Sequence, residues 1–285
     1  MIYYLYLIGW RVLRFIPSSM AYGLGRISAR YAYKKNGKGI SRLRSNMSKL
    51  TGITEEKELD ELTLKAVYSY TRYWIDSFLL PDWSVDEIIS RVTVVNGDYL
   101  TDAISEGRGC IVAIPHSGNW DLAGAFYSCT FSPVVTVAEH LKPEKLFKKF
   151  LEFRLDLGME VLDLESRTIP ILSRRLKAGE MIALVADRDI TNSGIKIPFG
   201  SGIASFPAGP ALLSLHNNSP LITAVISYND SGIVITFGER ITIPTNVSKE
   251  EALNLMISEL ADRFYQELRR HPEDWHMLQR VWIDQ

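Results

Sequence analysis

The sequence predicts an α/β fold with a mostly parallel central sheet flanked by helices. From residue 92 onward, strand-like runs alternate with helix-like segments, as in chains built from βαβ units. Several of these runs are apolar throughout, as strands covered on both faces of a sheet must be. The connections are short, and no linker rich in Pro, Gly or Ser divides the chain.

The composition fits one folded domain. The 285 residues are 46% hydrophobic and 23% charged, which excludes a disordered chain and is enough to bury a full core. Cys110 and Cys129 are the only cysteines, so a disulfide scaffold is excluded and a reducing, cytosolic setting is favoured. No apolar run reaches the roughly 18 residues of a membrane-spanning helix. We expect a single α/β domain over residues 51–285, preceded by a basic helical segment over residues 1–50.

The first fifty residues form a cationic segment. They hold ten Lys or Arg residues and no Asp or Glu, whereas residues 51–285 hold 22 basic and 33 acidic side chains. As a helix, the apolar stretch over residues 1–16 would span about 24 Å, less than the roughly 30 Å hydrocarbon core of a bilayer. We expect residues 1–50 to lie on an anionic membrane surface, where each Lys or Arg adds about 1 kcal/mol. The alternative is a helix packed on the domain with a solvated basic side. Nucleic acid is not expected as a partner, because no recognition motif is present.

Helices are predicted from capping residues and apolar spacing. A long helix over residues 54–80 would begin at Thr54 as its N-cap, with Glu55 and Glu56 in the first turn and Pro81 after its end. Residues 84–87 (SVDE) have the form of a capping box. Residues 18–49 are also compatible with a helix. Further helices are expected over residues 98–107, 119–130, 143–157, 167–178, 207–217 and 249–270.

Seven strands are predicted from apolar runs. They cover residues 92–96, 110–115, 133–138, 159–164, 181–186, 220–228 and 232–238. The last two are separated by Asn229, Asp230 and Ser231, which predicts an antiparallel hairpin. In a sheet of this kind, functional side chains are expected at the carboxyl ends of the parallel strands.

Polar side chains follow two of these strands. Residues 116–121 (HSGNWD) come after the strand at 110–115, and residues 187–189 (DRD) come after the strand at 181–186. We expect Asn119 to cap the following helix and Asp121, in its first turn, to reach the imidazole of His116. A carboxylate that holds one imidazole nitrogen leaves the other able to take a proton from a hydroxyl. The alternative is a purely structural turn, with Arg188 in an internal ion pair.

The predicted helix over residues 143–157 combines basic and aromatic side chains, namely Lys145, Lys148, Lys149, Arg154, Phe147, Phe150 and Phe153. Two interpretations are open. The helix binds CoA phosphates or anionic headgroups, or it is an amphipathic helix with its Phe side chains in the core.

Longer blocks of sequence carry a resemblance to a known family. His116 and Asp121 form an H-x4-D motif, and the surrounding string HSGNWD is similar to that of the lipid A late acyltransferases. Further matching blocks are YTRYWIDSF (70–78), VAEHLKPE (137–144), FRLDLGMEVL (153–162), LKAGEMIALVADRDIT (176–191), FGSGIASFPAGPA (199–211) and HPEDWHMLQRVW (271–282). In this order and over nearly the whole chain, they resemble the actinobacterial phosphatidylinositol mannoside acyltransferases. That family lies within the lipid A biosynthesis and lysophospholipid acyltransferase superfamily.

This resemblance implies a reaction. It implies an acyltransferase-like fold that moves a long-chain acyl group, such as palmitoyl, from acyl-CoA to a mannose hydroxyl of phosphatidylinositol mannoside. His116 would be the general base, with Asp121 and Asp187 as its catalytic carboxylates and Asp189 in reserve. Glu139 and Arg154 fall on positions similar to the sugar-side polar contacts of the family. The remaining candidates for binding substrate are Ser117, Asn119, Arg188 and Asp189.

The chemistry of the residues is consistent with that reaction. A thioester is already activated, so no nucleophilic residue is required, and no G-x-S-x-G elbow is present. Backbone N–H groups at residues 117–119 or 207–209 could stabilise the oxyanion. No metal or other cofactor is expected, because acyl-CoA would be a co-substrate. The protein is expected to be peripheral, at the cytoplasmic face of the plasma membrane. The alternatives are a lipid A or lysophospholipid type of transferase using acyl carrier protein or another lipid acceptor, a thioesterase-like hydrolase, and a non-enzymatic lipid carrier.

Overall fold

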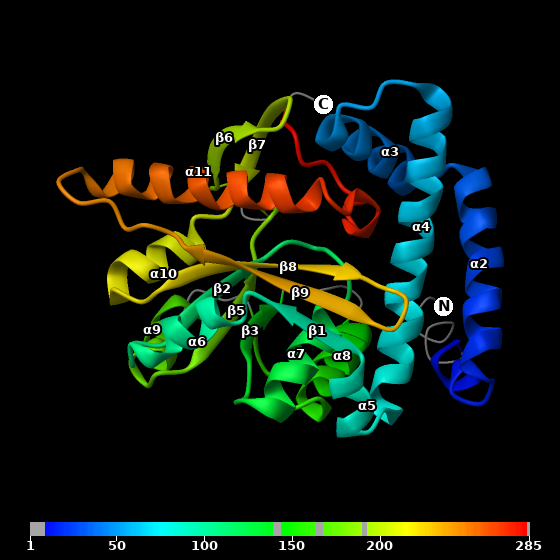
Figure 1. The fold of residues 1–285 in the computed structure, drawn as a ribbon, viewed down its shortest axis with the longest axis horizontal. Helices are drawn as coiled ribbons and strands as arrows, with labels where there is room; N and C mark the ends of the chain where they lie inside the picture. The colour runs from blue at the N-terminus through cyan, green and yellow to red at the C-terminus, as the bar shows by residue number, and fades with distance from the viewer. Residues whose placement is uncertain (1–8, 139–143, 164–167, 190–192, 284–285) are drawn as a thin grey trace.

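A seven-stranded sheet forms the centre of the molecule (Figure 1). The computed structural model describes residues 9–138, 144–163, 168–189 and 193–283. The strand order is β1-β9-β8-β2-β5-β3-β4. Strands β2, β3, β4, β5 and β8 run in one direction, whereas β9 is antiparallel to β8 and β1 is parallel to β9. The strands are β1 (Val92–Val95), β2 (Cys110–Ile114), β3 (Val135–Ala138), β4 (Glu160–Asp163), β5 (Met181–Val185), β8 (Leu221–Tyr228) and β9 (Ile233–Arg240). The predicted α/β fold and the hairpin at residues 220–238 are confirmed.

Helices cover both faces of this sheet. The side chains of β2 alternate: Ile111 and Ala113 point into one apolar core, and Cys110 and Val112 point into the other. The first core is completed by α9 (Thr168–Lys177), α10 (Gly209–Asn217) and α11 (Lys249–Leu268). The second is completed by α5 (Val85–Ser90), α6 (Asp98–Ser105), α7 (Trp120–Thr130) and α8 (Glu144–Asp156). Burial on both faces explains why these strands read as continuous apolar runs.

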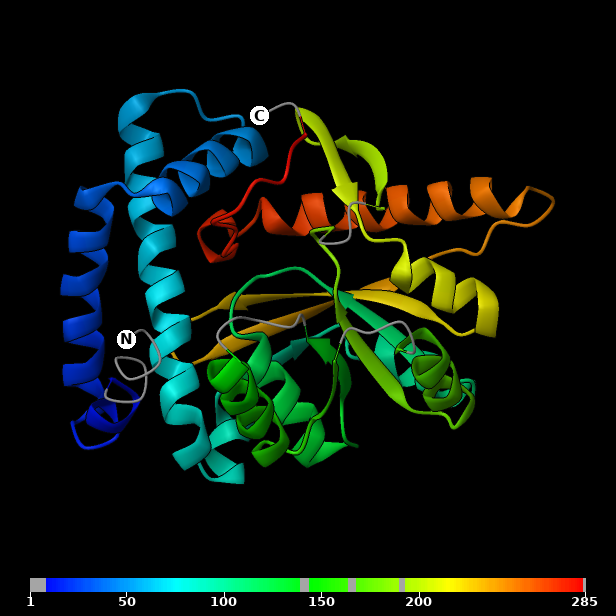
Figure 2. The same ribbon diagram turned by 180° about the vertical axis from the view of Figure 1, so that it is seen from behind.

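The N-terminal helices pack on one side of this layered body. Residues 9–13 are helical, and α2 (Ser18–Lys35), α3 (Lys38–Thr51) and α4 (Glu56–Leu79) follow. Figure 1 and Figure 2 both show α2 as the outermost helix, separated from the sheet by α4. Helix α3 places Leu43, Met47 and Leu50 fully in the first core. Of the helices that the structure describes, none has the length and apolar character that crossing a bilayer requires.

One local prediction was wrong, and one pair of strands was not predicted. The long helix α4 is capped by Glu55, whose side chain accepts from the N–H of Glu58, and not by Thr54. The region before α10 contains an unpredicted antiparallel hairpin of two short strands, β6 (Ile195–Phe199) and β7 (Gly202–Phe206). In contrast, Ser84 caps α5 as the capping box predicts. Two short 3-10 helices complete the fold, η1 (Leu80–Asp82) and η2 (Pro272–Asp274).

Candidate active site

His116 and Asp187 form a hydrogen-bonded pair at the carboxyl edge of the sheet. Strands β2 and β5 are parallel neighbours with Ile114 opposite Val185, so the residues two positions beyond each strand meet. Nδ1 of His116 lies 2.6 Å from Oδ1 of Asp187, and the backbone N–H of His116 donates to Oδ2 at 2.9 Å. The pairing of a histidine with a carboxylate after the second strand is as the sequence analysis expected.

The carboxylate of this pair is buried and stays ionised. The Asp187 side chain is fully buried, whereas 32% of the His116 side chain is exposed. Burial alone would raise the pKa of Asp187, but the charge of His116 and the hydrogen bonds from His116 and Trp275 hold that pKa below its ordinary value. An ionised Asp187 accepts from Nδ1–H of His116, which leaves Nε2 as the nitrogen that can accept a proton.

Two cavities meet beside this histidine. One combines aromatic and aliphatic side chains with several ionisable groups, and we call it the polar cavity; the other is lined almost entirely by apolar side chains. The polar cavity is lined by His116, Arg188, His276 and aromatic side chains of α4, α7 and α8. The apolar cavity lies between the sheet and α7, and its lining includes Ala123, Gly124, Met159, Ala224 and Phe237. Both cavities are bordered by Trp120, Val137, Arg154 and Val185. Polar and apolar parts of a substrate could therefore bind on the two sides of these four residues.

Asp121 does not reach His116, which corrects the expected pairing. Its Oδ2 accepts from the hydroxyl of Tyr73 at 2.9 Å, and its Oδ1 accepts from Nε of Arg154 at 2.7 Å. The physical reason is the start of α7: Asn119 caps the helix by accepting from the N–H of Leu122. The first turn then directs the buried Asp121 side chain toward α4 and α8. The H-x4-D spacing thus places Asp121 in a cluster with Tyr73 and Arg154 and not against His116.

Two expected substrate contacts are structural instead. Ser117 and Asn119 are fully buried, and neither borders the cavity beside His116. Their side chains accept backbone N–H groups, that of Ile226 for Ser117 and that of Leu122 for Asn119. The N–H groups of Ser117 and Gly118 already donate to carbonyl oxygens of Pro115 and Asp274. These two N–H groups are therefore engaged in the turn, which corrects their expected use as oxyanion donors.

The other candidates divide between the cavity and its surroundings. Arg154 and Arg188 line the polar cavity, and their binding of substrate stays a prediction. Asp189 contacts the region of the β6–β7 hairpin: it accepts from the N–H of Gly194 and from the hydroxyl of Ser205 on β7. Glu139 lies outside the described residues.

The side chains of α8 divide between the cavity, the core and the surface, and its binding of CoA phosphates or headgroups stays a prediction. Phe147 and Phe150 line the polar cavity, whereas Phe153 is in the second core. Lys148 and Lys149 form ion pairs with Glu144 and Glu152 on the same helix. The basic side is thus a surface helix face, and part of the aromatic side reaches the site.

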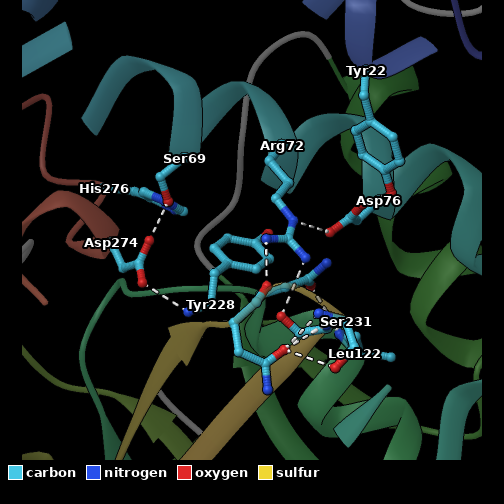
Figure 3. Close-up of polar contacts among 12 residues, drawn as sticks. Tyr22, Ser69, Arg72, Asp76, Leu122, Tyr228, Ser231, Asp274 and His276 are labelled. Carbon is cyan, nitrogen blue, oxygen red and sulfur yellow. Dashed lines mark hydrogen bonds and ion pairs between the residues drawn. The ribbon is translucent and has the colours of Figure 1, made fainter. Parts of the chain in front are cut away.

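Sequence reasoning missed a group of buried residues behind the cavity. The Asp274 carboxylate accepts from the Ser69 hydroxyl at 2.6 Å and from the N–H of Tyr228 at 2.7 Å, and Ser69 also contacts Nε2 of His276 at 2.9 Å (Figure 3). Trp275 donates from Nε1 to Oδ2 of Asp187 at 2.8 Å. The block HPEDWH was the available signal, but nothing in its spacing indicates which distant residues it contacts.

The fold and this site define an enzyme class. A His–carboxylate pair beside joined polar and apolar cavities, on a mostly parallel sheet, suits an acyltransferase that handles a lipid chain.

Sequence comparison identifies the family. The sequence model of the family described as bacterial lipid A biosynthesis acyltransferase matches residues 1–283. The chain is 37% identical, over 98% of its length and 90% of the relative's, to a phosphatidylinositol mannoside acyltransferase of Mycolicibacterium smegmatis (strain ATCC 700084 / mc(2)155). It is 33% identical, over 98% of its length and 87% of the relative's, to a protein of the same name from Mycobacterium tuberculosis (strain ATCC 25618 / H37Rv). The chain therefore belongs to the bacterial lipid A biosynthesis acyltransferase family.

Proposed function

We propose that this chain transfers a long-chain acyl group, such as palmitoyl, from acyl-CoA to a mannose hydroxyl of phosphatidylinositol mannoside. The observation that carries the proposal is the His116–Asp187 pair at the junction of a polar and an apolar cavity. The names of the relatives supply the acceptor, since both act on phosphatidylinositol mannoside by name.

The imidazole supplies the base for this transfer. Nε2 of His116 takes the proton of the mannose hydroxyl as its oxygen attacks the thioester carbonyl carbon, and Asp187 stabilises the imidazolium through Nδ1–H. The resulting tetrahedral oxyanion collapses and breaks the carbon–sulfur bond. The proton on Nε2 passes to the departing sulfur, so the products are an ester and free CoA, and the imidazole is again neutral.

The apolar cavity would hold the acyl chain. Its lining comes from the centre of the sheet and from α7, so a chain that enters past Trp120 runs among aliphatic and aromatic side chains. Each methylene that enters the cavity contributes about 0.8 kcal/mol to binding of the donor.

The polar cavity would hold the sugar of the acceptor. Arg154 on α8 borders both cavities and is held by the buried Asp121. Arg188 follows the carboxyl end of β5 and lines the polar cavity. Guanidinium groups donate several hydrogen bonds in a fixed geometry, which suits the hydroxyls and phosphate of a mannosylated phosphoinositol headgroup.

Helix α2 would place the site on a membrane. Its outward face carries four exposed apolar side chains at spacings of four, three and four residues: Met20, Leu24, Ile27 and Tyr31. The exposed Arg26 and Arg30 lie on the same helix, and residues 1–50 contain no acidic side chain. An apolar stripe among basic residues is typical of helices that lie on anionic lipid surfaces. We place the chain on the cytoplasmic face of the plasma membrane, where acyl-CoA is available.

Acceptor dependence is the test of this function. Purified protein is incubated with palmitoyl-CoA, with or without phosphatidylinositol mannoside, and the release of free thiol is followed. We expect thiol release only with the acceptor, together with an acylated lipid product. Thiol release that is equal without acceptor would show a hydrolase. Transfer from palmitoyl-acyl carrier protein but not from palmitoyl-CoA would contradict the proposed donor, and no turnover with either donor would favour a lipid carrier.

A further inference from the structure

The C-terminal segment returns to the His116–Asp187 pair and contacts it from behind. Nε1 of Trp275 donates to Oδ2 of Asp187 at 2.8 Å. The next residue, His276, donates its backbone N–H to the carbonyl oxygen of His116 at 2.8 Å. The carbonyl oxygen of Asp274 accepts from the N–H of Gly118 at 2.9 Å. Three consecutive residues, 274–276, thus contact Asp187, the backbone of His116 and the turn at Gly118.

This segment is itself fixed by three separate elements. The Asp274 carboxylate is bound by Ser69 on α4 and by the N–H of Tyr228 at the end of β8 (Figure 3). The Asn46 amide on α3 donates to the carbonyl oxygens of Met277 and Gln279. These anchors on α3, α4 and β8 hold the segment that carries Trp275 in addition to its contacts with the backbone of residues 116–118.

The hydrogen bonds on Asp187 divide between its two oxygens. Among the described residues, Oδ1 accepts from the His116 imidazole, whereas Oδ2 accepts from the backbone of His116 and from Trp275. Trp275 is therefore the side chain that fixes the carboxylate from outside the histidine. Hydrogen bonds of this kind stabilise a charged carboxylate strongly, and Asp187 is fully buried where water does not replace a lost donor.

We propose that Trp275 is a positioning residue of the transfer reaction: its indole N–H holds the Asp187 carboxylate in the orientation that sets Oδ1 on the His116 imidazole. This inference rests on the proposed role of His116 as the base. Trp275 touches neither substrate nor the reacting atoms and acts only through Asp187.

The chain offers a matched control for this role. Trp282 is as deeply buried as Trp275, and its Nε1 also donates a hydrogen bond, but to the carbonyl oxygen of Phe199. The Trp275→Phe and Trp282→Phe substitutions each delete one indole N–H and similar volume from the same aromatic cluster. Thermal unfolding of both variants measures the shared cost of lost packing.

The experiment follows the protonation of the pair directly and through activity. The imidazole resonance of His116, assigned by its absence in His116→Ala, is titrated by NMR in the full-length protein. With one donor fewer, the pair becomes more basic and takes up its proton at higher pH. The other ionisable side chains that line the cavity beside His116 do not titrate in this range. The guanidinium groups of Arg154 and Arg188 stay charged, and burial raises the pKa of Tyr70 and Tyr73. Burial and the charge of His116 lower the pKa of His276 to about 3.

In Trp275→Phe we expect the titration midpoint of the pair to rise by about one pH unit and kcat to fall about tenfold, with the KM for palmitoyl-CoA unchanged. The acidic limb of the pH–rate profile should move by the same amount, and Trp282→Phe should leave both unmoved. Equal midpoints in the two variants would overturn the inference. Because the NMR titration does not depend on turnover, it tests Trp275 even if the assay shows that the proposed acyl transfer is wrong.

Discussion

At the scale of single residues, the turn after β2 shows how side-chain size fixes the site. Gly118 has a φ of +56°, and a Cβ there would lie 2.7 Å from the carbonyl oxygen of Ile226. Only glycine fits this left-handed, crowded position, which brings His116 to the sheet edge and starts α7 at Asn119. The sequence analysis anticipated the helix cap at Asn119, because a cap depends on neighbours in the chain.

A second glycine, Gly124, lines the apolar cavity. A Cβ on Gly124 would lie 2.4 Å from Sδ of Met159, and both residues line that cavity. In Gly124→Ala we expect the flexible Met159 side chain to be displaced into the cavity and shorten it. The preferred donor should shift from palmitoyl-CoA to shorter acyl-CoA thioesters, measured as the ratio of kcat/KM values across chain lengths. Because Met159→Ala returns the space, the double variant should recover palmitoyl transfer. If Gly124→Ala kept the wild-type chain-length preference, the acyl chain would bind elsewhere.

The residue scale also shows what local reasoning cannot reach. Asp187 could be predicted as the partner of His116 because both follow adjacent buried strands. The pairing of Asp121 with His116 was wrong, because the direction of its side chain depends on where α4 and α8 supply Tyr73 and Arg154. Trp275 and its neighbours were missed because their contacts join residues some 90 to 200 positions apart in the chain.

At the scale of elements, burial explains which strands could be predicted. The runs that form β2, β5 and β8 are apolar on both faces and stand out from the helices around them. The β6–β7 hairpin gives no such signal, because its residues alternate between buried and exposed and include Lys196, Pro198 and Gly200. Its two strands form a small sheet of their own, and α11 packs on it.

Helix α2 is the element whose sequence carries the membrane proposal. Leu24 on its outward face and Leu255 on α11 are each 50% exposed. We expect Leu24→Glu to weaken binding to vesicles rich in phosphatidylinositol by about tenfold, since it removes an apolar contact and adds a charge repelled by the lipid. Leu255→Glu makes the same chemical change elsewhere and should leave binding intact. Sedimentation with vesicles measures both, and raising the salt concentration should weaken the wild-type interaction. Equal binding by the two variants would show that α2 does not contact lipid.

At the scale of the whole molecule, buried titratable groups couple folding to pH. Burial and the charge of His116 lower the pKa of His276 from 6.5 to about 3. The unfolded chain therefore takes up a proton at this residue near pH 6.5, whereas the folded chain does not until about pH 3. The contribution of His276 to stability is thus lost progressively as the pH falls from about 6.5 toward 3. Burial raises the pKa of Asp76 and Asp274. These two carboxyl groups therefore favour the folded chain as the pH falls, which opposes the effect of His276.

Because these effects overlap, the test compares slopes. The free energy of unfolding in urea is measured between pH 4 and 7 for the wild type and for His276→Gln, whose amide does not titrate. We expect the variant to lose less stability over this range than the wild type, whatever its stability at neutral pH. Parallel curves would show that His276 is protonated alike in the folded and unfolded chains.

The whole molecule brings together two strand ends, two cavities and a C-terminal segment around one imidazole. The most direct measurement of its role is the rate of palmitoyl transfer to phosphatidylinositol mannoside by His116→Ala, with thermal unfolding and palmitoyl-CoA binding measured on the same sample. The account predicts a loss of about 10²- to 10⁴-fold in transfer, with fold and donor binding retained. A folded variant that still transfers palmitate within a few-fold of the wild-type rate would contradict it.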